Sequence, residues 1–194
     1  MKIRNCAVAG FLGLMTFTLS AQQTAPAPHA AGSTASLAET MQAIQNELNK
    51  VGKLNFTIHI QDKEEGNATV QYSTEIGNVV ADAASCTIRY HRKRSMRGEV
   101  VNDEDVSISL RDVLGLSMMT VEQHEKAVFE REKASADEQQ TAHMQFDPPM
   151  FMVVARKAGD NEEGFAFIDE KMAGRVAKAL GRGVELCGGD NVPY

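Results

Sequence analysis

Alternating apolar and polar residues, repeated in short segments through the middle of the chain, limit the fold more than any other feature. The clearest segment is residues 54–61 (LNFTIHIQ), in which every second side chain is apolar. A period of two is the pattern of a β-strand with one buried face. Similar segments recur up to residue 168, separated by turn-forming residues such as 64–67 (EEGN). The pattern predicts about seven short antiparallel strands.

A helical pattern precedes the strands. Ser36, with Glu39 three residues later, is a capping-box signature at a helix start. Apolar residues then recur at helical spacing as far as Val51, and Gly52 can end the helix. The pattern predicts an N-terminal helix that packs through one face.

A second, strongly amphipathic helix is predicted after the last strand, with Asp169 as its N-cap. On a helical wheel its larger apolar side chains gather on one side: Met172, Val176, Leu180, Val184 and Cys187. We therefore expect a capping helix that covers the strands with this side. Gly181 and Gly183 cost helix stability, on the order of 1 kcal/mol each, so the last turns need packing or a covalent tie.

Residues 122–145 interrupt the strand region with a charged, helix-favouring segment that has only a weak apolar stripe. We interpret this segment as a helical or mobile insertion. Pro148 and Pro149 follow at the start of the next strand, a place where proline is tolerated. The sequence thus predicts one globular domain of α+β class over residues 37–194.

The residues before this domain have a different character. Lys2 and Arg4 precede a short apolar run that ends in small residues, which is typical of a secretory signal peptide. We place the signal peptide at 1–21, with a cut after Ser20 as the alternative, and a flexible linker at 22–36. A membrane anchor is less favoured, because spanning a bilayer needs roughly 20 apolar residues. The expected location is periplasmic or extracellular, with no transmembrane segment in the mature chain.

Two segments carry a family resemblance. In residues 106–118 (VSISLRDVLGLSM) a strand reaches a polar corner and turns into the next strand. In residues 165–186 (FAFIDEKMAGRVAKALGRGVEL) the last strand leads into the final helix. With the order of elements, these segments resemble the pleckstrin-homology-like superfold. The resemblance implies an antiparallel β-barrel or sandwich of about seven strands closed by a C-terminal helix. It also implies a scaffold used mainly to bind lipids, peptides or proteins, and seldom for catalysis.

Two cysteines would remain after the signal peptide, with Cys6, is removed: Cys86 and Cys187. Thiols tend to pair in an oxidising compartment, so we expect a disulfide that pins the end of the last helix to the third strand. A closed loop of about 100 residues is worth up to about 4–5 kcal/mol in the chain-entropy model. The alternatives are inert free thiols and a catalytic thiol, which would need a nearby base such as His91 or His59.

Two basic groups stand out in a chain whose formal net charge is −6. The first lies on the predicted last helix, opposite its apolar side: Lys171, Arg175, Lys178 and Arg182. The second lies in and after the third strand: Arg89, Arg92, Lys93, Arg94 and Arg97. Either group could contact an anionic partner such as acidic phospholipid. We favour two other interpretations, a solvated helix face and pairing of the strand with the acidic segment 99–105.

The sequence offers little chemistry. It has no P-loop, no helical zinc motif and no complete nucleophile elbow, so we expect no cofactor and no metal. An acidic chain is also a poor match for nucleic acid. We therefore predict an exported non-enzymatic binding module for an unknown protein, peptide or anionic lipid. The alternatives are a small secreted hydrolase that uses dispersed residues such as His91, Asp112 and Ser117, and a structural envelope protein.

Overall fold

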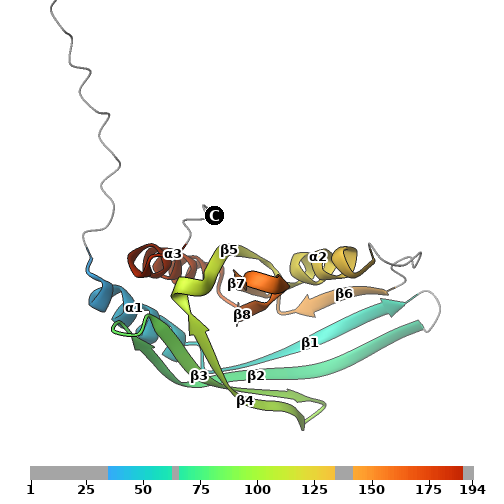
Figure 1. Cartoon of the computed structure of the whole chain (residues 1–194). Coiled ribbons are helices and arrows are strands. Elements are labelled where there is room, and N and C mark those ends of the chain that lie inside the picture. The colour runs from blue at the N-terminus through green and yellow to red at the C-terminus, as the bar shows by residue number, and fades with distance from the viewer. Residues whose placement is uncertain (1–34, 63–65, 134–141, 190–194) are drawn as a thin grey trace, which may run out of the picture. The chain divides into compact units, whose positions relative to one another are not determined.

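The computed structural model describes residues 35–62, 66–133 and 142–189, which belong to a compact unit that begins at Ala35. Within these residues the chain forms three α-helices and eight β-strands, and the strands make two antiparallel sheets (Figure 1). The chain is thus of the α+β class, as predicted. The predicted signal peptide and nearly all of the predicted linker lie outside the described residues.

The larger sheet is built mainly from hairpins. Its five strands are β1 (Lys53–Asp62), β2 (Gly66–Asp82), β3 (Thr87–Met96), β4 (Glu99–Ser109) and β6 (Ala142–Asp147). Their order is β4-β3-β2-β1-β6, so β1 to β4 form a meander and β6 joins the free side of β1. The register of β2 shifts between Gly77 and Val80, where Asn78 has a left-handed φ of 53°. A bulge of this kind lets the long β2 bend toward helix α1 (Leu37–Asn49), where Ala81 N donates to Gln45 Oε1 at 3.0 Å.

The smaller sheet contains three strands: β5 (Val113–Thr120), β7 (Phe151–Lys157) and β8 (Glu162–Phe167), in the order β5-β7-β8. A short 3-10 turn, Leu110–Asp112, leads from β4 into β5. Within the described residues no strand of one sheet is hydrogen-bonded to a strand of the other. Of the expected barrel or sandwich, a closed barrel is therefore not formed, and the two antiparallel sheets remain separate.

The described residues contain eight strands instead of the predicted seven or so. The additional strand is β6, which pairs antiparallel with β1 and places Phe146 opposite Ile58. Residues 142–145 were expected to belong to the insertion, because only Met144 and Phe146 give the strand an apolar side. The first part of the insertion, interpreted as helical or mobile, forms α2 (Val121–Lys133).

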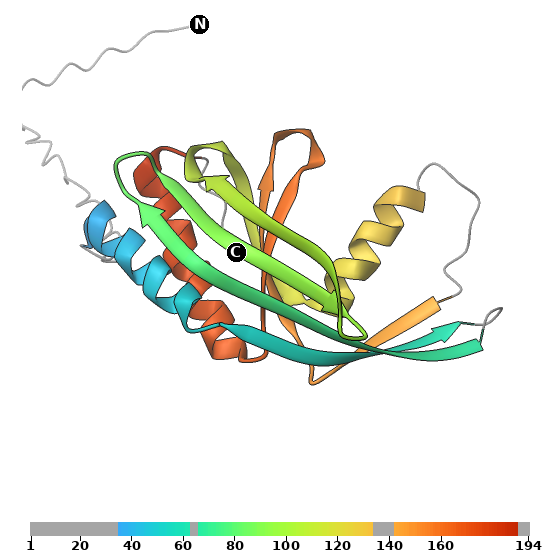
Figure 2. The same cartoon turned by 90° about the horizontal axis from the view of Figure 1, so that it is seen from below.

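The hydrophobic core lies where the first and the last of the described helices pack against the sheets. Figure 2 shows α1 (Leu37–Asn49, blue) beside α3 (Glu170–Cys187, red). A Cβ on Gly183 of α3 would lie 3.0 Å from Leu110 Cδ1 and 3.2 Å from Ile44 Cδ1. This glycine weakens an isolated helix but permits the close approach of α1 and α3. Packing against α1 thus contributes to the stability of the last turns of α3.

Both of these helices begin at the predicted caps. The Ser36 N–H donates to Glu39 Oε2 at 2.8 Å, and the Glu39 N–H donates to Ser36 Oγ at 3.3 Å, so the capping box is complete. Asp169 Oδ1 accepts from the N–H groups of Lys171 at 2.8 Å and Met172 at 3.3 Å. The side chains satisfy N–H groups that have no partner inside the helix.

Candidate functional site

A cavity of about 340 Å³ lies between α2 and one face of the smaller sheet. We call this face the Ser117 face, because Ser117 on β5, Val154 on β7 and Gly164 on β8 stand opposite one another across the three strands. The other face of the sheet carries Val153 and Phe165, both fully buried. The cavity is therefore on the side of the sheet that is turned away from the core.

The cavity combines apolar surface with a few polar groups. Its apolar lining consists of Leu116, Met119, Ala127 and Val154. Its polar lining consists of Ser117, His124, Arg156 and Glu162. Sites for small molecules typically measure about 300–1,000 Å³ and have this mixture, in which apolar surface supplies contact area and few polar groups fix the orientation.

Two glycines on the Ser117 face leave room for neighbouring side chains, and one of them, Gly115, lines the cavity. A Cβ on Gly115 would lie 3.2 Å from Arg156 Nη2, and a Cβ on Gly164 would lie 2.2 Å from Met152 Cε. The Arg156 guanidinium and the Met152 side chain therefore lie over neighbouring strands at places where no side chain rises from the sheet. The position of the guanidinium in the cavity thus depends on the glycine beside it.

His124, near the start of α2, is held by Glu162 of β8. Its Nε2 lies 3.1 Å from Glu162 Oε2, and the two side chains are 13% and 20% exposed. A carboxylate only accepts, so His124 Nε2 donates in this bond. His124 Nδ1 is buried, with no hydrogen-bond partner among the described residues, and its distance of 3.8 Å to Glu125 Oε1 is too long for a hydrogen bond.

Arg156 is the cationic group of the cavity. It lies on β7 directly opposite Glu162 of β8, and Glu162 is engaged by His124. The Arg156 side chain is exposed and has no hydrogen bond or ion pair with another residue in the described part of the chain. Its guanidinium is therefore a donor that a molecule in the cavity can reach.

The three residues that the sequence suggests for a hydrolase site, His91, Asp112 and Ser117, do not form one site. His91 lies on β3, where its Nε2 is 2.8 Å from Asp103 Oδ1 and its Nδ1 is 3.0 Å from Asp105 Oδ1. Asp112 is exposed in the turn before β5. Ser117 does line a cavity, but the histidine beside that cavity is His124.

Sequence reasoning missed three residues of the cavity: His124, Arg156 and Glu162. His124 lies in the segment interpreted as an insertion, and the other two lie at strand ends. One signal was present, since Arg156 alternates with Val154 along a strand. The convergence of the three residues, however, depends on the register of β7 with β8 and on the position of α2.

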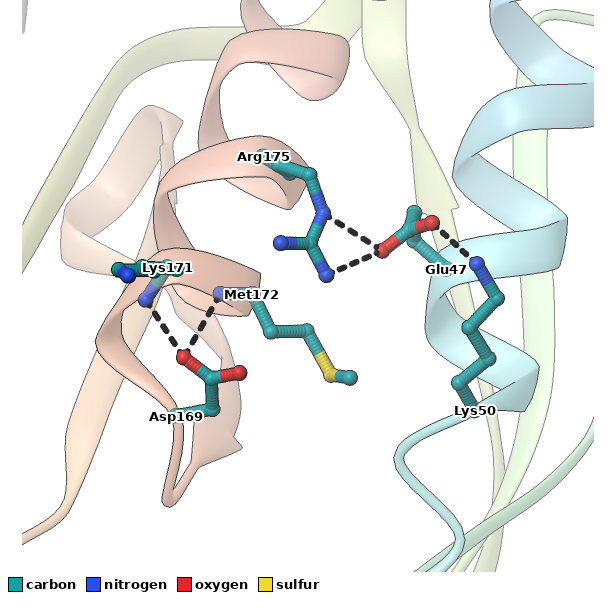
Figure 3. A network of polar contacts seen from close by, with 6 residues as sticks. All are labelled: Glu47, Lys50, Asp169, Lys171, Met172 and Arg175. Carbon is teal, nitrogen blue, oxygen red and sulfur yellow. Dashed lines mark hydrogen bonds and ion pairs between the residues drawn. The ribbon is translucent and has the colours of Figure 1, made fainter.

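The basic stripe of α3 is partly occupied by contacts within the chain. Arg175 donates through Nε and Nη2 to Glu47 Oε2 of α1, each at 3.1 Å, and Lys50 binds the other oxygen of the same carboxylate (Figure 3). Arg182 Nη1 donates to Glu185 Oε2 at 3.0 Å. Lys171 and Lys178 are exposed. Half of the stripe therefore contacts carboxylates of the chain itself.

The basic run of β3 faces the acidic strand β4, as the favoured interpretation predicts. The register places His91 opposite Asp105, Arg92 opposite Glu104 and Lys93 opposite Asp103. The next pair, Arg94 opposite Asn102, continues the alignment. Arg89 and Arg97 are exposed. Two of the five basic residues, Arg92 and Lys93, thus stand opposite acidic residues of β4.

Arg92 also joins the two sheets. Its residue is only 8% exposed, and it donates to Glu104 on β4 through Nε at 3.0 Å and to Glu163 on β8 through Nη1 at 3.0 Å. Beside it, the rings of Tyr90 and Phe165 pack at 5.1 Å between centroids. Burial raises the pKa of the Tyr90 hydroxyl well above its ordinary value. Arg92 therefore has a structural role and is not available to an external anion.

Cys86 and Cys187 lie at disulfide distance, with Sγ atoms 2.10 Å and Cα atoms 5.9 Å apart. Cys86 occupies the turn before β3, where its backbone has a left-handed φ of 56°, and Cys187 is the last residue of α3. The pair ties the end of the helix to the start of the third strand, as the sequence predicts.

Comparisons with known proteins give no relative: no protein-family model, no curated protein and no solved structure matches the chain. Among the described residues, none of the helices combines the length and the apolar character needed to cross a membrane. The same residues contain no cluster of three or more His, Cys, Asp or Glu side chains placed to hold a metal ion.

Proposed function

We propose that the chain is an exported, non-enzymatic binding module that takes up a small ligand between α2 and the Ser117 face. The observation that carries this proposal is the cavity of about 340 Å³ with its mixed lining. It offers apolar contact area, a hydroxyl, a guanidinium without a partner among the described residues, and a His–Glu pair. These are the components that orient a small molecule.

The geometry favours binding over catalysis. A histidine that activates a serine needs a nitrogen within hydrogen-bond reach of the hydroxyl. His124 Nε2 is taken by Glu162, and His124 Nδ1 is buried without a hydrogen bond in the described residues. A hydrolase is the second candidate, because Ser117 and the His124–Glu162 pair line the same cavity.

Export is supported by two observations. The first residues have the pattern of a secretory signal peptide, and the remaining two cysteines lie at disulfide distance, which fits an oxidising compartment outside the cytoplasm. We therefore propose that the protein acts in the periplasm or outside the cell. We propose a small ligand as its main binding partner. A protein, peptide or anionic lipid partner is also in keeping with the proposal.

The pleckstrin-homology-like architecture is proposed on the order of the elements. A four-stranded meander, β1 to β4, is followed by a three-stranded one, β5-β7-β8, and then by α3. The segment α2–β6 is inserted between β5 and β7. This order supports the resemblance, although the sheets do not close into a barrel.

The proposal is tested by screening small fragments against the isotope-labelled protein. We expect some fragments to shift the backbone amide resonances of Gly115, Ser117 and Val154 in proton–nitrogen NMR spectra. Ser117→Phe should fill the cavity and lower the binding affinity of these fragments by about tenfold or more. Ser73→Phe, on β2 of the larger sheet, is the matched control and should leave binding unchanged.

The outcomes separate the two candidates. If no fragment shifts the cavity resonances, the binding proposal is wrong. A serine-directed fluorophosphonate probe is expected to leave Ser117 unlabelled. Covalent labelling of Ser117 that is lost in His124→Gln would instead establish the hydrolase.

A further inference from the structure

We infer that the cavity selects small organic anions with an apolar body, and that Arg156 binds their anionic group. This inference rests on the proposed function and adds the class of ligand. It follows from where the charge lies in the cavity and from which of the charged groups already have partners.

The first step concerns the available charge. Two charged side chains of opposite sign line the cavity, Arg156 and Glu162. The Glu162 carboxylate accepts from His124 Nε2 at 3.1 Å, so one of its oxygens already has a partner. No hydrogen bond or ion pair occupies the Arg156 guanidinium among the described residues. Of the two charged groups, the one whose polar atoms are all open to a ligand is therefore Arg156.

The second step concerns the position of that charge. Arg156 Nη2 is the side-chain atom closest to the place where a Cβ on Gly115 would stand, at 3.2 Å. The guanidinium therefore lies over β5, beside the cavity wall, while the side chain remains exposed to solvent. A planar guanidinium with free N–H groups matches the two oxygens of a carboxylate or the oxygens of a phosphate. Ser117, in the same lining, offers a hydroxyl as a second donor.

The third step concerns the rest of the ligand. Met119, Ala127 and Val154 supply the apolar part of the lining on the Ser117 face, whereas the neighbouring Leu116 places its side chain on the core face. Met119 is an unbranched thioether, which adapts to ligands of different shape. A ligand that fills the cavity therefore carries one anionic end toward Arg156 and a short apolar chain over these residues.

Three eight-carbon probes that differ only in their head group test the inference: octanoate, octanol and octylamine. Binding is measured by titration calorimetry, and the cavity resonances confirm the site. We expect the affinity for octanoate to be at least about 10-fold higher than that for octanol, because a hydrogen bond to a charged group contributes about this difference in binding free energy. Octylamine should bind more weakly than octanol.

Two variants change the guanidinium in different ways. Arg156→Met keeps a long apolar side chain and should remove the preference for octanoate over octanol. Gly115→Val keeps the charge but occupies the space in which the guanidinium lies, and it should weaken octanoate more than octanol. Arg89→Met removes an exposed arginine of β3 that does not line the cavity. It is the matched control and should leave all three affinities unchanged. Circular dichroism melting curves verify that each variant is folded.

Failure of the inference and failure of the proposed function are distinguishable. If octanoate and octanol bind equally at the cavity, or if Arg156→Met keeps the preference, Arg156 does not select the ligand, although the cavity still binds one. Preference for octylamine would identify Glu162 as the selecting group and would also overturn the inference. If none of the three probes nor any fragment reaches the cavity, the proposed function fails as well.

Discussion

Two neighbouring residues of β3, His91 and Arg92, point to opposite faces of the sheet and stabilise the protein in different ways. Arg92 is almost completely buried between two carboxylates, so removing it would leave Glu104 and Glu163 close together without their cation. Breaking a buried pair in this way is costly, even where the intact pair adds little. His91 is more exposed, and its contribution depends on its protonation.

His91 predicts a pH dependence of stability. Its hydrogen bond with Asp105, helped by the charge of Asp103, raises the pKa of the imidazole above its ordinary value near 6.5. A raised folded-state pKa stabilises the protein fully below the unfolded pKa, and this stabilisation is lost as the pH rises through the folded pKa. Urea unfolding should therefore show the wild type more stable than His91→Gln at about pH 5.5, with the difference gone by about pH 8.5.

The control for this prediction is another histidine of the larger sheet. His59 of β1 contacts the Thr69 hydroxyl through Nδ1 at 3.4 Å instead of a carboxylate. His59→Gln removes a histidine of the same sheet without breaking an ion pair among the described residues, so it measures the effect of the substitution itself at each pH. A difference between wild type and His91→Gln that stays constant from about pH 5.5 to 8.5 would contradict the assigned role of the two aspartates.

The helix α3 contributes to the fold in three ways. Its apolar side is buried in the core, its end holds Cys187, and its basic stripe reaches α1 through Arg175. The stripe was expected to be either a solvated face or a contact for an anionic partner. The pairing with Glu47 is a third use, which lies within the chain. Contact of the remaining exposed residues, Lys171 and Lys178, with acidic phospholipid stays a prediction.

Charge reversal on α3 should separate these uses. Arg175→Glu would place a carboxylate beside Glu47 and weaken the α1–α3 contact, whereas Lys178→Glu changes an exposed residue. Exposed ion pairs contribute up to about 1 kcal/mol. We expect Arg175→Glu to lower the free energy of unfolding by about that much more than Lys178→Glu. Equal effects of the two variants in urea unfolding would show that the pair contributes nothing.

The elements differ in how well the sequence predicts them, for physical reasons. The ends of α1 and α3 are marked by the local caps at Ser36 and Asp169, and the pairing of β3 with β4 is marked by opposite charges close in sequence. β6 is short and has only two large apolar residues, so its pairing with β1 is decided by contacts with residues distant in the sequence. The cavity was not predictable, because His124, Arg156 and Glu162 converge only after strand register is fixed.

For the molecule as a whole, the bond between Cys86 and Cys187 is the longest-range covalent constraint, with a sequence separation of 101. A closed loop of this size reduces the freedom of the unfolded chain by about 4–5 kcal/mol in the chain-entropy model. The double variant Cys86→Ala/Cys187→Ala should therefore unfold at a much lower urea concentration than the oxidised wild type.

A reducing agent provides the matching control. It should destabilise the wild type to nearly the level of the double variant and have no effect on the double variant itself. If thiol-specific reagents label both cysteines in the native exported protein, the bond is not formed and the prediction is wrong.

The position of β6 has a consequence for the route by which the chain folds. β1 to β4 are joined by hairpins and can pair soon after each turn forms, because their loops are short. The other side of β1 must wait for β6, which arrives much later in the chain, after β5 and α2. During this interval β1 presents an unpaired strand edge, and such edges readily accept strands from other molecules. The late-arriving β6 thus covers the edge of β1 over Thr57–Asp62.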